Sequence, residues 1–565
     1  MMAIQEMPIG YDSFEMVRQN DCYYVDKTML IKQLLAKKAL VTLITRPRRF
    51  GKSLNMSMLD CFFDVTRKNS KELFAGLKIT EETELCIDWM NQYPTIFISF
   101  KDVGGNVYPY ALEQLKSVIS NLFKKHTYLL SDERIDEDDK AVFKRIKAKT
   151  STEAELTDSL QLLSKLMSIY FSNDNGKVKK AIILIDEYDV PLDKGNTNDY
   201  YKDIVIIIRD LLSKALKTNE YLQMGVVTGC LRIAKESIFT GLNNPAIDSI
   251  SKGRIDEFFG FTESEVDQIL SDYGFEDKKP IIKEWYDGYQ FGRFDVYCPW
   301  DVINYISDLR TFDDAEPQCY WANTSGVDVI RPFLKKFRAK LSDYFTVLFN
   351  GGTVNAVINE KLTYLDINSS DLDNFWSLLY LCGYLTTAGV NGKANATALK
   401  IPNEEVKIIL QQSITQWFKN DVVPNNLEVI LRQMWACDDI GLQNSIGDLL
   451  FKAISFYDYS EEFYHAFLAG ILVTSPYDVK SNRENGEGRT DVTLEDLENR
   501  RAAIFEFKVA KNPEDLEERA CAAIKQIDDL GYAKQFLYEG YKEIIKIGIG
   551  YFKKRCVVKI EKITN

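Results

Sequence analysis

Short apolar runs alternate with longer amphipathic segments through the first part of the chain. The apolar runs, which predict buried strands, are ALVTLIT (39–45), TIFISF (95–100), AIILID (181–186) and MGVVTG (224–229). The segments between them are largely amphipathic, as in DIVIIIRDLLSKAL (203–216), and predict helices. Because buried strands that alternate with helices are typical of a parallel sheet, we expect an α/β fold with helices on both faces of that sheet.

The pattern changes near residue 262 and again near residue 450. In the middle region, NFWSLLYLCGYLTTAG predicts a helix, a glycine and a strand, followed by the strand ALKIPN and a helix from Glu404. This order is compatible with a winged-helix-like unit and equally with a generic helical lid. The last region returns to an α/β pattern, with strands predicted in TDVTL, AAIFEFKVA, IIKIGIGYF and RCVVKI. Three domains are therefore expected, at 1–261, 262–450 and 451–565.

The composition argues against several kinds of protein. The 565 residues are 45% hydrophobic, 12% aromatic and 27% charged, which describes a folded protein. The formal net charge of -13 gives no overall attraction to nucleic acid or acidic membranes, so such a partner would need a local basic patch. The ten cysteines include no C-x-x-C pair and the two histidines are His126 and His465, which argues against a zinc site.

The chain is expected to be cytoplasmic. Its scattered cysteines are typical of reduced thiols in that compartment. The start MMAIQEMPIG lacks the basic residues and apolar run of a secretion signal. No apolar stretch approaches the roughly 20 residues that cross a bilayer, so no membrane partner is expected.

The stretch RPRRFGKS (46–53) lies between the first predicted strand and a predicted helix. It ends like the phosphate-binding motif G-x-x-x-x-G-K-[ST], with Gly51, Lys52 and Ser53 in place, but Arg46 stands at the first glycine. In such a loop the backbone N–H groups and the helix N-terminus bind phosphates, the lysine adds charge, and the hydroxyl holds Mg²⁺. The other loop residues expected to bind the cofactor or to supply positive charge are Arg46, Arg48, Arg49 and Phe50.

Two strand ends downstream would complete a nucleotide site. AIILIDE places Asp186 and Glu187 at the tip of a buried strand, where Asp186 would hold Mg²⁺ and Glu187 would orient or activate the attacking water. VVTGCLR ends the next strand with Thr228, which would sense the γ-phosphate, and Arg232 would stabilise charge. An ordinary strand that ends in solvated acids explains one such match. It explains poorly why the GKS loop and the acidic strand end occur together in this order. A surface arginine explains Arg232 equally well.

A second site is predicted near the carboxyl terminus, in RTDVTL followed by AAIFEFKVAK. Alternate residues of a strand face the same side, so Glu506 and Lys508 would lie together, opposite Phe505 and Phe507. An adjacent strand, joined by a polar turn, would add Asp491. Asp491 and Glu506 would bind Mg²⁺ and the lysine would stabilise negative charge, which suits phosphodiester hydrolysis. A solvated strand face explains this short pattern just as simply.

Several stretches together resemble one family. They are YYVDKT, RPRRFGKSL, LIDEYDVPL, VTGCLRIAKESIFTGLNN, FGFTESEV and WYDGYQFG. The chain resembles, along nearly its whole length, the AAA-ATPase-like family of anaerobic bacteria. The resemblance implies a P-loop NTPase sheet. It also implies that the family generally has another residue in place of the first glycine, and that residues 26–28 lie near the nucleotide base.

The carboxyl-terminal region resembles the PD-(D/E)XK nuclease superfamily, which implies a restriction-endonuclease-like α/β domain. EEFYHAFLAG matches its opening helix and AIKQIDDLGY a later one. The residues that the resemblance adds to the site are Glu461 or Glu462, Gln526 and Tyr532. The proline of the superfamily name is absent, because Thr490 precedes Asp491. The basic stretch FKKRCVVK (552–559) predicts either a phosphate contact or simply an exposed hairpin.

These observations predict an ATP-binding and ATP-hydrolysing protein that controls a Mg²⁺-dependent DNA nuclease. A role in mobile-DNA defence or maintenance rests on fold analogy. The expected partners are DNA at the carboxyl-terminal domain and further copies of the chain, if an arginine must reach a neighbour's ATP. One alternative is an ATP-dependent switch whose nuclease-like domain only binds nucleic acid or protein. Another is a regulator that binds DNA through the winged-helix-like segment without cutting it.

Overall fold

The structure, a computed structural model, forms two compact units that are each continuous in space but not in sequence. One contains Met1–Gly326 and Asn355–Lys407, and the other contains Val327–Val354 and Ile408–Asn565. The three domain limits expected from the sequence stay a prediction. The structure describes residues 5–172, 179–217, 219–231, 245–251, 253–321, 344–345, 347–362, 366, 371–391, 396–417, 424–453, 464, 468–469, 471–472, 475–485 and 488–564.

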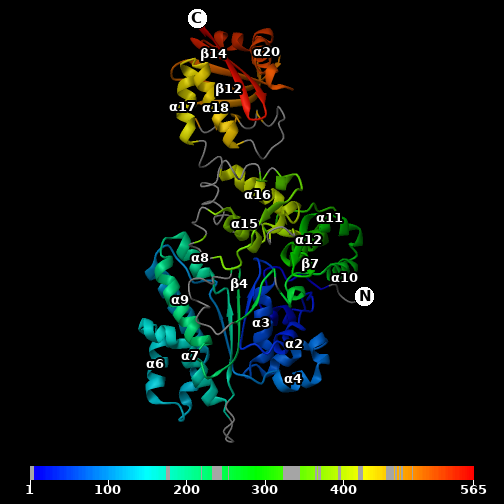
Figure 1. Ribbon diagram of the computed structural model, residues 1–565, viewed down its shortest axis with the longest axis vertical. Helices are drawn as coiled ribbons and strands as arrows, with labels where there is room; N and C mark the ends of the chain where they lie inside the picture. Colours follow the sequence, from blue (N-terminus) through cyan, green and yellow to red (C-terminus); the bar gives the residue numbers. More distant parts are fainter. Residues whose placement is uncertain are drawn as a thin grey trace. The chain divides into compact units, whose positions relative to one another are not determined.

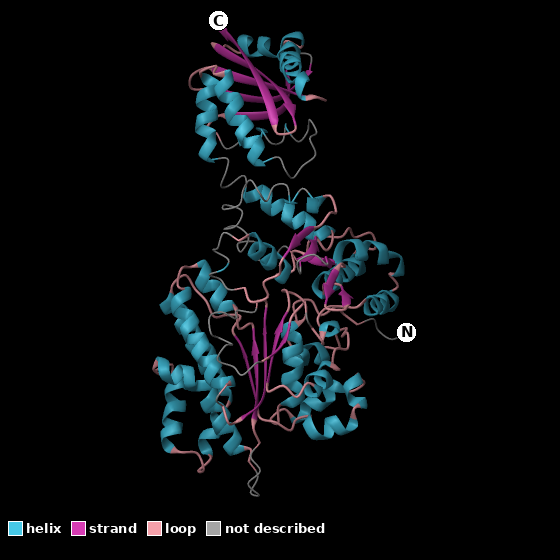
Figure 2. Cartoon of the chain, viewed as in Figure 1, coloured by secondary structure: helices cyan, strands magenta, loops and turns pink. Residues whose placement is uncertain are grey.

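A five-stranded parallel sheet forms the centre of the first unit (Figures 1 and 2). Its strands are β1 (Val41–Thr45), β2 (Thr95–Ser99), β3 (Ala181–Asp186), β4 (Leu222–Gly229) and β5 (Ala246–Asp248). The spatial order is β2-β3-β4-β1-β5, and every neighbouring pair runs parallel. The expected α/β sheet is confirmed. Because β4 lies between β1 and β3, the carboxyl ends of these three strands lie side by side, next to the RPRRFGKS loop.

Helices cover both faces of this sheet (Figure 1). One face carries α1 (Phe14–Gln19), α2 (Leu30–Ala36), α3 (Lys52–Phe63) and α4 (Thr83–Trp89), and the other carries α5 (Tyr108–Lys125), α6 (Glu137–Lys147), α7 (Glu153–Tyr170), α8 (Val190–Thr197) and α9 (Tyr201–Leu216). Residues such as Leu59 and Phe62 of α3 are buried against Leu184 and Val226 of the sheet. Each such side chain contributes about 1.5–3 kcal/mol through burial, which fixes α3 and the loop before it.

Residues 372–417 follow the order of helix, strand, strand and helix that the sequence predicts for this part of the chain. The helix α15 ends before Gly383, whose φ of 88° only glycine adopts easily, and the strands β9 and β10 then pair antiparallel before α16. The elements from residue 263 to residue 417 are α10 (Glu263–Tyr273), α11 (Lys279–Tyr286), β6 (Tyr289–Phe291), β7 (Phe294–Val296), α12 (Pro299–Thr311), β8 (Val354–Ala356), α15 (Leu372–Leu381), β9 (Thr386–Asn391), β10 (Ala396–Lys400) and α16 (Glu404–Trp417). Of these, β8 begins in the second unit and α16 ends in it.

The second unit contains a mixed sheet with helices on both faces (Figure 2). Its elements are α17 (Pro424–Trp435), α18 (Asp439–Ala453), β11 (Asp478–Asn485), β12 (Gly488–Asp496), β13 (Arg501–Val509), α20 (Leu516–Asp529), α21 (Tyr532–Tyr538), β14 (Glu543–Phe552) and β15 (Arg555–Thr564). The strand order is β11-β12-β13-β14-β15, and only β13 and β14 pair in parallel. The expected pairing of the two strands that carry the acidic motif is confirmed.

The helix α20 lies unusually close to β14. A Cβ atom at Gly548 would stand 2.4 Å from the carbonyl oxygen of Ala520, and one at Gly550 would stand 2.2 Å from that of Leu516. The two glycines therefore let the helix backbone rest directly on the strand.

Along the described parts of the chain, none of the helices combines the length and apolar character that crossing a membrane requires.

Candidate nucleotide and nuclease sites

The loop between β1 and α3 brings the predicted nucleotide residues together. Ser53 Oγ donates to Asp186 Oδ2 at 2.7 Å, and Thr228 Oγ1 donates to Asp186 Oδ1. Lys52 Nζ folds back onto the loop and donates to the carbonyl oxygens of Arg46 at 3.0 Å and of Pro47 at 2.7 Å. Asp186 is 2% exposed, so it is not the solvated acid of an ordinary strand end. Three parallel strands thus end around one lysine and one acid.

Arg46 does not point toward this site. Its Nη2 atom lies 2.8 Å from Asp248 Oδ1 and 2.6 Å from Asp256 Oδ1, and its Nη1 atom donates to the carbonyl oxygen of Thr45. The side chain is fully buried beneath the loop. Burial raises the pKa of Asp256 to about 6, although the charge of Arg46 opposes that rise. The expectation that Arg46 adds charge to the phosphate site is therefore wrong, because its charge compensates two buried acids.

The other loop residues differ in what they offer a nucleotide. The Arg49 guanidinium lies 4.1 Å from the ring centroid of Trp300, a cation–π contact at the rim of the site. The Phe50 side chain is buried against Tyr289 and Phe291, so Phe50 offers the site its backbone N–H group alone. Arg48 is partly exposed and lies 3.5 Å from Asp193.

The acids after β3 divide into two environments. Glu187 has a φ of 52° and lines the pocket, and burial together with the neighbouring Asp186 charge raises its pKa. Asp189 is buried and accepts backbone hydrogen bonds from Cys230 at 2.8 Å and Leu231 at 3.0 Å. It thereby shapes the turn after β4. The sequence reasoning missed Asp189, although it is the third acid in the run DEYD.

A pocket of about 520 Å³ lies above the loop, within the size range of ligand sites. Its wall includes Lys27, which Glu265 holds at 2.6 Å, so one of residues 26–28 does reach the pocket. The pocket residues from α12 and from the segment just before α10 were not predicted. The pocket-lining side chains that the sequence gave no sign of are Tyr11, Lys101, Lys194, Phe261, Trp300 and Ile303.

The second site forms where β12, β13 and α20 meet. The register Val492 to Phe505 sets Asp491 beside the end of β13 that carries Glu506, and the Phe507 N–H group donates to Asp491 Oδ2 at 2.8 Å. Lys508 Nζ lies 3.6 Å from Glu506 Oε1. Gln526 Nε2 donates to the same Glu506 oxygen from α20. All four residues predicted for this site are therefore brought together.

Glu506 is the electrostatic centre of this group. It is 1% exposed, and its Oε2 atom is buried with no hydrogen-bond partner among the described residues. Burial, and then the charge of Asp491, raise its pKa to about 8. A buried carboxylate with one unsatisfied oxygen beside a second carboxylate fits a divalent cation, whose charge would compensate both acids. Within the described ranges, no three His, Cys, Asp or Glu side chains converge as a metal-ligand group.

Some predicted residues cannot be placed. Arg232, Glu461, Glu462 and His465 lie outside the described residues. Tyr532 is buried beside the second site, where burial and then the charge of Glu506 raise its pKa.

Comparison with known proteins agrees with the two kinds of domain that the sequence predicts. Residues 8–239 match the family model described as predicted AAA-ATPase, and residues 459–561 match that of the PD-(D/E)XK nuclease superfamily. The chain is also 27% identical over 562 residues to an uncharacterized protein in the vnfD 5' region of Azotobacter chroococcum mcd 1, with 95% of each chain covered. The resemblance drawn from the motifs is confirmed. The first part of this chain is therefore similar to the predicted AAA-ATPases, and its last part is similar to the PD-(D/E)XK nuclease superfamily.

Proposed function

We propose that the chain binds and hydrolyses ATP in the 520 Å³ pocket and that this nucleotide cycle controls a Mg²⁺-dependent DNA nuclease in the second unit. The observation that carries the proposal is the buried, half-satisfied Glu506 carboxylate beside Asp491 and Lys508. A charge buried without a full set of partners is costly, and it is typical of a site that binds a ligand or catalyses a reaction.

In the nucleotide site each residue has a distinct task. The backbone N–H groups from Phe50 to Ser53 and the start of α3 would bind phosphates. Lys52 would leave its two carbonyl partners for the β and γ phosphates, and Ser53 with Asp186 would hold Mg²⁺. Glu187, whose pKa is raised, would orient the attacking water. Arg232 would supply charge, in this copy or to a neighbouring copy of the chain.

In the nuclease site Asp491 and Glu506 would hold Mg²⁺, which polarises a phosphate and lowers the pKa of bound water. Lys508 would stabilise the negative charge that develops on the phosphate oxygens. Gln526 fixes the orientation of Glu506 through its hydrogen bond and would keep that role with the metal present. DNA is the proposed substrate, and defence against mobile DNA or its maintenance is the proposed setting.

A second candidate function is an ATP-dependent switch with an inactive nuclease-like domain. The observation in its favour is that the described part of the site offers two carboxylates and no third. In that case the second unit would bind nucleic acid or protein without cutting.

One experiment separates the two candidates. Full-length protein would be incubated with Mg²⁺ and linear or circular DNA, with and without ATP, beside the variants Asp491→Ala and Lys52→Ala. Cleavage that disappears in Asp491→Ala and changes in Lys52→Ala supports a nuclease controlled by nucleotide. ATP turnover without cleavage of DNA or RNA by any form would favour the switch.

A further inference from the structure

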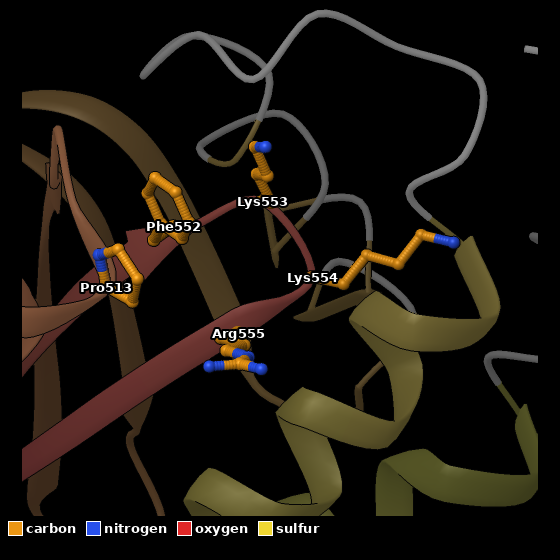
Figure 3. Close-up of a pocket in the computed structure, with 5 residues that line it drawn as sticks. All are labelled: Pro513, Phe552, Lys553, Lys554 and Arg555. Atoms are coloured by element: carbon orange, nitrogen blue, oxygen red, sulfur yellow. The ribbon is translucent and has the colours of Figure 1, made fainter.

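A hairpin with three consecutive basic residues lies beyond the nuclease site. The strands β14 and β15 meet at the pair Phe552 and Arg555, with Lys553 and Lys554 in the turn between them. Figure 3 shows the three basic side chains spreading away from one another, while Phe552 lies beside Pro513. These five residues line a hollow of about 400 Å³. We call Phe552–Arg555 the basic hairpin.

The register of the sheet relates this hairpin to the catalytic residues. Lys508 pairs with Gly550 and Phe552 pairs with Arg555, so Phe552 and Arg555 continue the face of the sheet that carries Glu506 and Lys508. From Lys508 to Arg555 the path covers two residues along a strand, at about 3.3 Å each, and two steps between strands, at about 4.8 Å each. The two residues are therefore roughly 12 Å apart. That separation corresponds to about three to four nucleotides at 3.4 Å per nucleotide.

The hairpin is held in place independently of any ligand. The Tyr464 hydroxyl donates to the carbonyl oxygen of Lys553 at 2.8 Å, and the Tyr464 ring stacks on Tyr551 with centroids 4.2 Å apart. Lys553 Nζ lies 5.4 Å from the Phe552 ring. A fixed turn loses little conformational entropy when it binds a partner, which favours a binding role.

A fourth basic residue lies between the hairpin and the catalytic group. Arg519 and Gln526 are seven residues apart on α20 and so lie on the same face of that helix. The Arg519 Cβ atom is 3.2 Å from the position a Cβ would take at Gly550, next to Lys508 in the sheet. Its Nε atom is buried with no hydrogen-bond partner among the described residues. The Arg519 side chain as a whole is partly exposed, so the outer nitrogens of its guanidinium are suited to a phosphate oxygen.

The basic hairpin is itself positively charged, unlike the protein as a whole. The chain carries a net charge of -13, whereas no ion pair joins Lys553, Arg555 or Arg519 to another described residue. Lys559 of β15 is different, because Glu517 lies 2.8 Å from its Nζ atom. Three cations without an ion pair to another described residue therefore lie at the end of the sheet where the catalytic residues lie, and a polyanion is the partner that they fit.

We propose that the basic hairpin and Arg519 bind the DNA backbone a few nucleotides from the phosphodiester that is cut. Arg519 contacts the phosphate nearer the catalytic group, and Lys553 and Arg555 contact one farther along the same strand. The proposal rests on the proposed nuclease function for the identity of the substrate, but the binding surface itself does not require cleavage.

The test uses full-length protein carrying Asp491→Ala, so that DNA stays intact, and measures binding of a fluorescent duplex over a series of salt concentrations. Adding Lys553→Ala with Arg555→Ala is expected to weaken binding about tenfold and to lower the slope of log K against log salt by about 2, since each phosphate contact contributes about 0.9. Arg519→Gln is expected to lower that slope by about 1. The matched control, Lys534→Ala with Lys542→Ala, removes two exposed lysines of the same unit away from the hairpin and should change neither value.

Thermal unfolding of each variant verifies that it is folded, because these residues are on the surface or partly exposed. Equal affinity and slope for the hairpin variant and the control would overturn the proposal. Loss of RNA binding with unchanged DNA binding would also overturn it. If the protein with an intact Asp491 cuts no DNA but the hairpin variant still loses affinity, the binding surface stands and the nuclease function fails.

Discussion

Arg46 replaces the first glycine of the phosphate-loop motif, but the loop still brings Ser53 to Asp186. The position usually belongs to glycine, but here Asp248 and Asp256, both about 1% exposed, depend on the arginine for compensation. We expect Arg46→Gly, which restores the usual motif, to lower the free energy of unfolding by about 3–5 kcal/mol, since it leaves the buried Asp256 without its ion pair and Asp248 with Lys37 alone. Urea denaturation measures this.

The control for that change is Arg48→Gly, two residues along the same loop. Its side chain is 41% exposed and its nearest acid, Asp193, is 3.5 Å away, so the expected loss is about 1 kcal/mol or less. An Arg46→Gly protein as stable as the Arg48→Gly protein would contradict this account.

The raised pKa of Glu506 makes a prediction about pH. An unfolded glutamate ionises near pH 4.3, whereas burial and Asp491 raise the pKa of folded Glu506 to about 8. Between these values the folded protein holds one more proton than the unfolded chain, so the stability that Glu506 provides is complete below about pH 4.3 and is lost as pH rises to 8. Metal binding displaces that proton, so stabilisation by Mg²⁺ should grow over the same interval.

Glu506→Gln removes this titration. In a metal chelator at pH 8, the variant is expected to melt at a higher temperature than the unchanged protein, and it should gain nothing from Mg²⁺. The control is Glu514→Gln, an exposed position of the same unit. A Glu506→Gln protein that melts lower at pH 8 and still responds to Mg²⁺ would show that Glu506 is not the metal ligand.

At the level of elements, the contact between α20 and β14 depends on glycine. Gly548→Ala would place a methyl group 2.4 Å from the Ala520 carbonyl oxygen, so α20 would have to move and carry Gln526 with it. The expected cost is about 1–3 kcal/mol of stability together with reduced nuclease activity. Gly447→Ala on α18, where nothing lies within 4 Å, should instead be neutral or stabilising by up to about 1 kcal/mol. Urea denaturation and cleavage rates check both variants.

The elements that the sequence predicted well are those with a continuous apolar pattern. β1, β3 and β4 are buried on both faces, and β13 carries the alternation that placed Glu506 beside Lys508. β11, with the sequence DVKSNREN, was missed because this polar edge strand pairs on one side alone.

Long-range partners set the limit of such prediction. Asp248 and Asp256 lie more than 200 residues beyond Arg46, so no local pattern joined them to the loop. Trp300 reaches the pocket in the same way, from a helix outside the predicted ATPase domain. Arg519 had a local sign, its spacing of seven residues from Gln526 on one helix face, which the sequence reasoning did not use.

At the scale of the whole molecule, the two units predict two responses to ligands. Calorimetry with Mg-ATP should raise the melting transition of the first unit by an amount equivalent to about 2.7 kcal/mol at 100 times the dissociation constant. The transition of the second unit should stay in place, and Lys52→Ala should abolish the shift. A single transition that moves as a whole would mean that the units unfold together.

The chain passes between the two units three times, at residues 326–327, 354–355 and 407–408, and this affects the order in which a ribosome completes them. The phosphate loop is made early, but Gly383 packs against Pro47, and Glu360 accepts a hydrogen bond from Ser251 at 2.6 Å. The ATP-binding unit therefore waits for about 400 residues of synthesis before it can close. The residues proposed to cut DNA emerge only afterwards, so synthesis of the proposed nuclease site is completed after that of the unit proposed to control it.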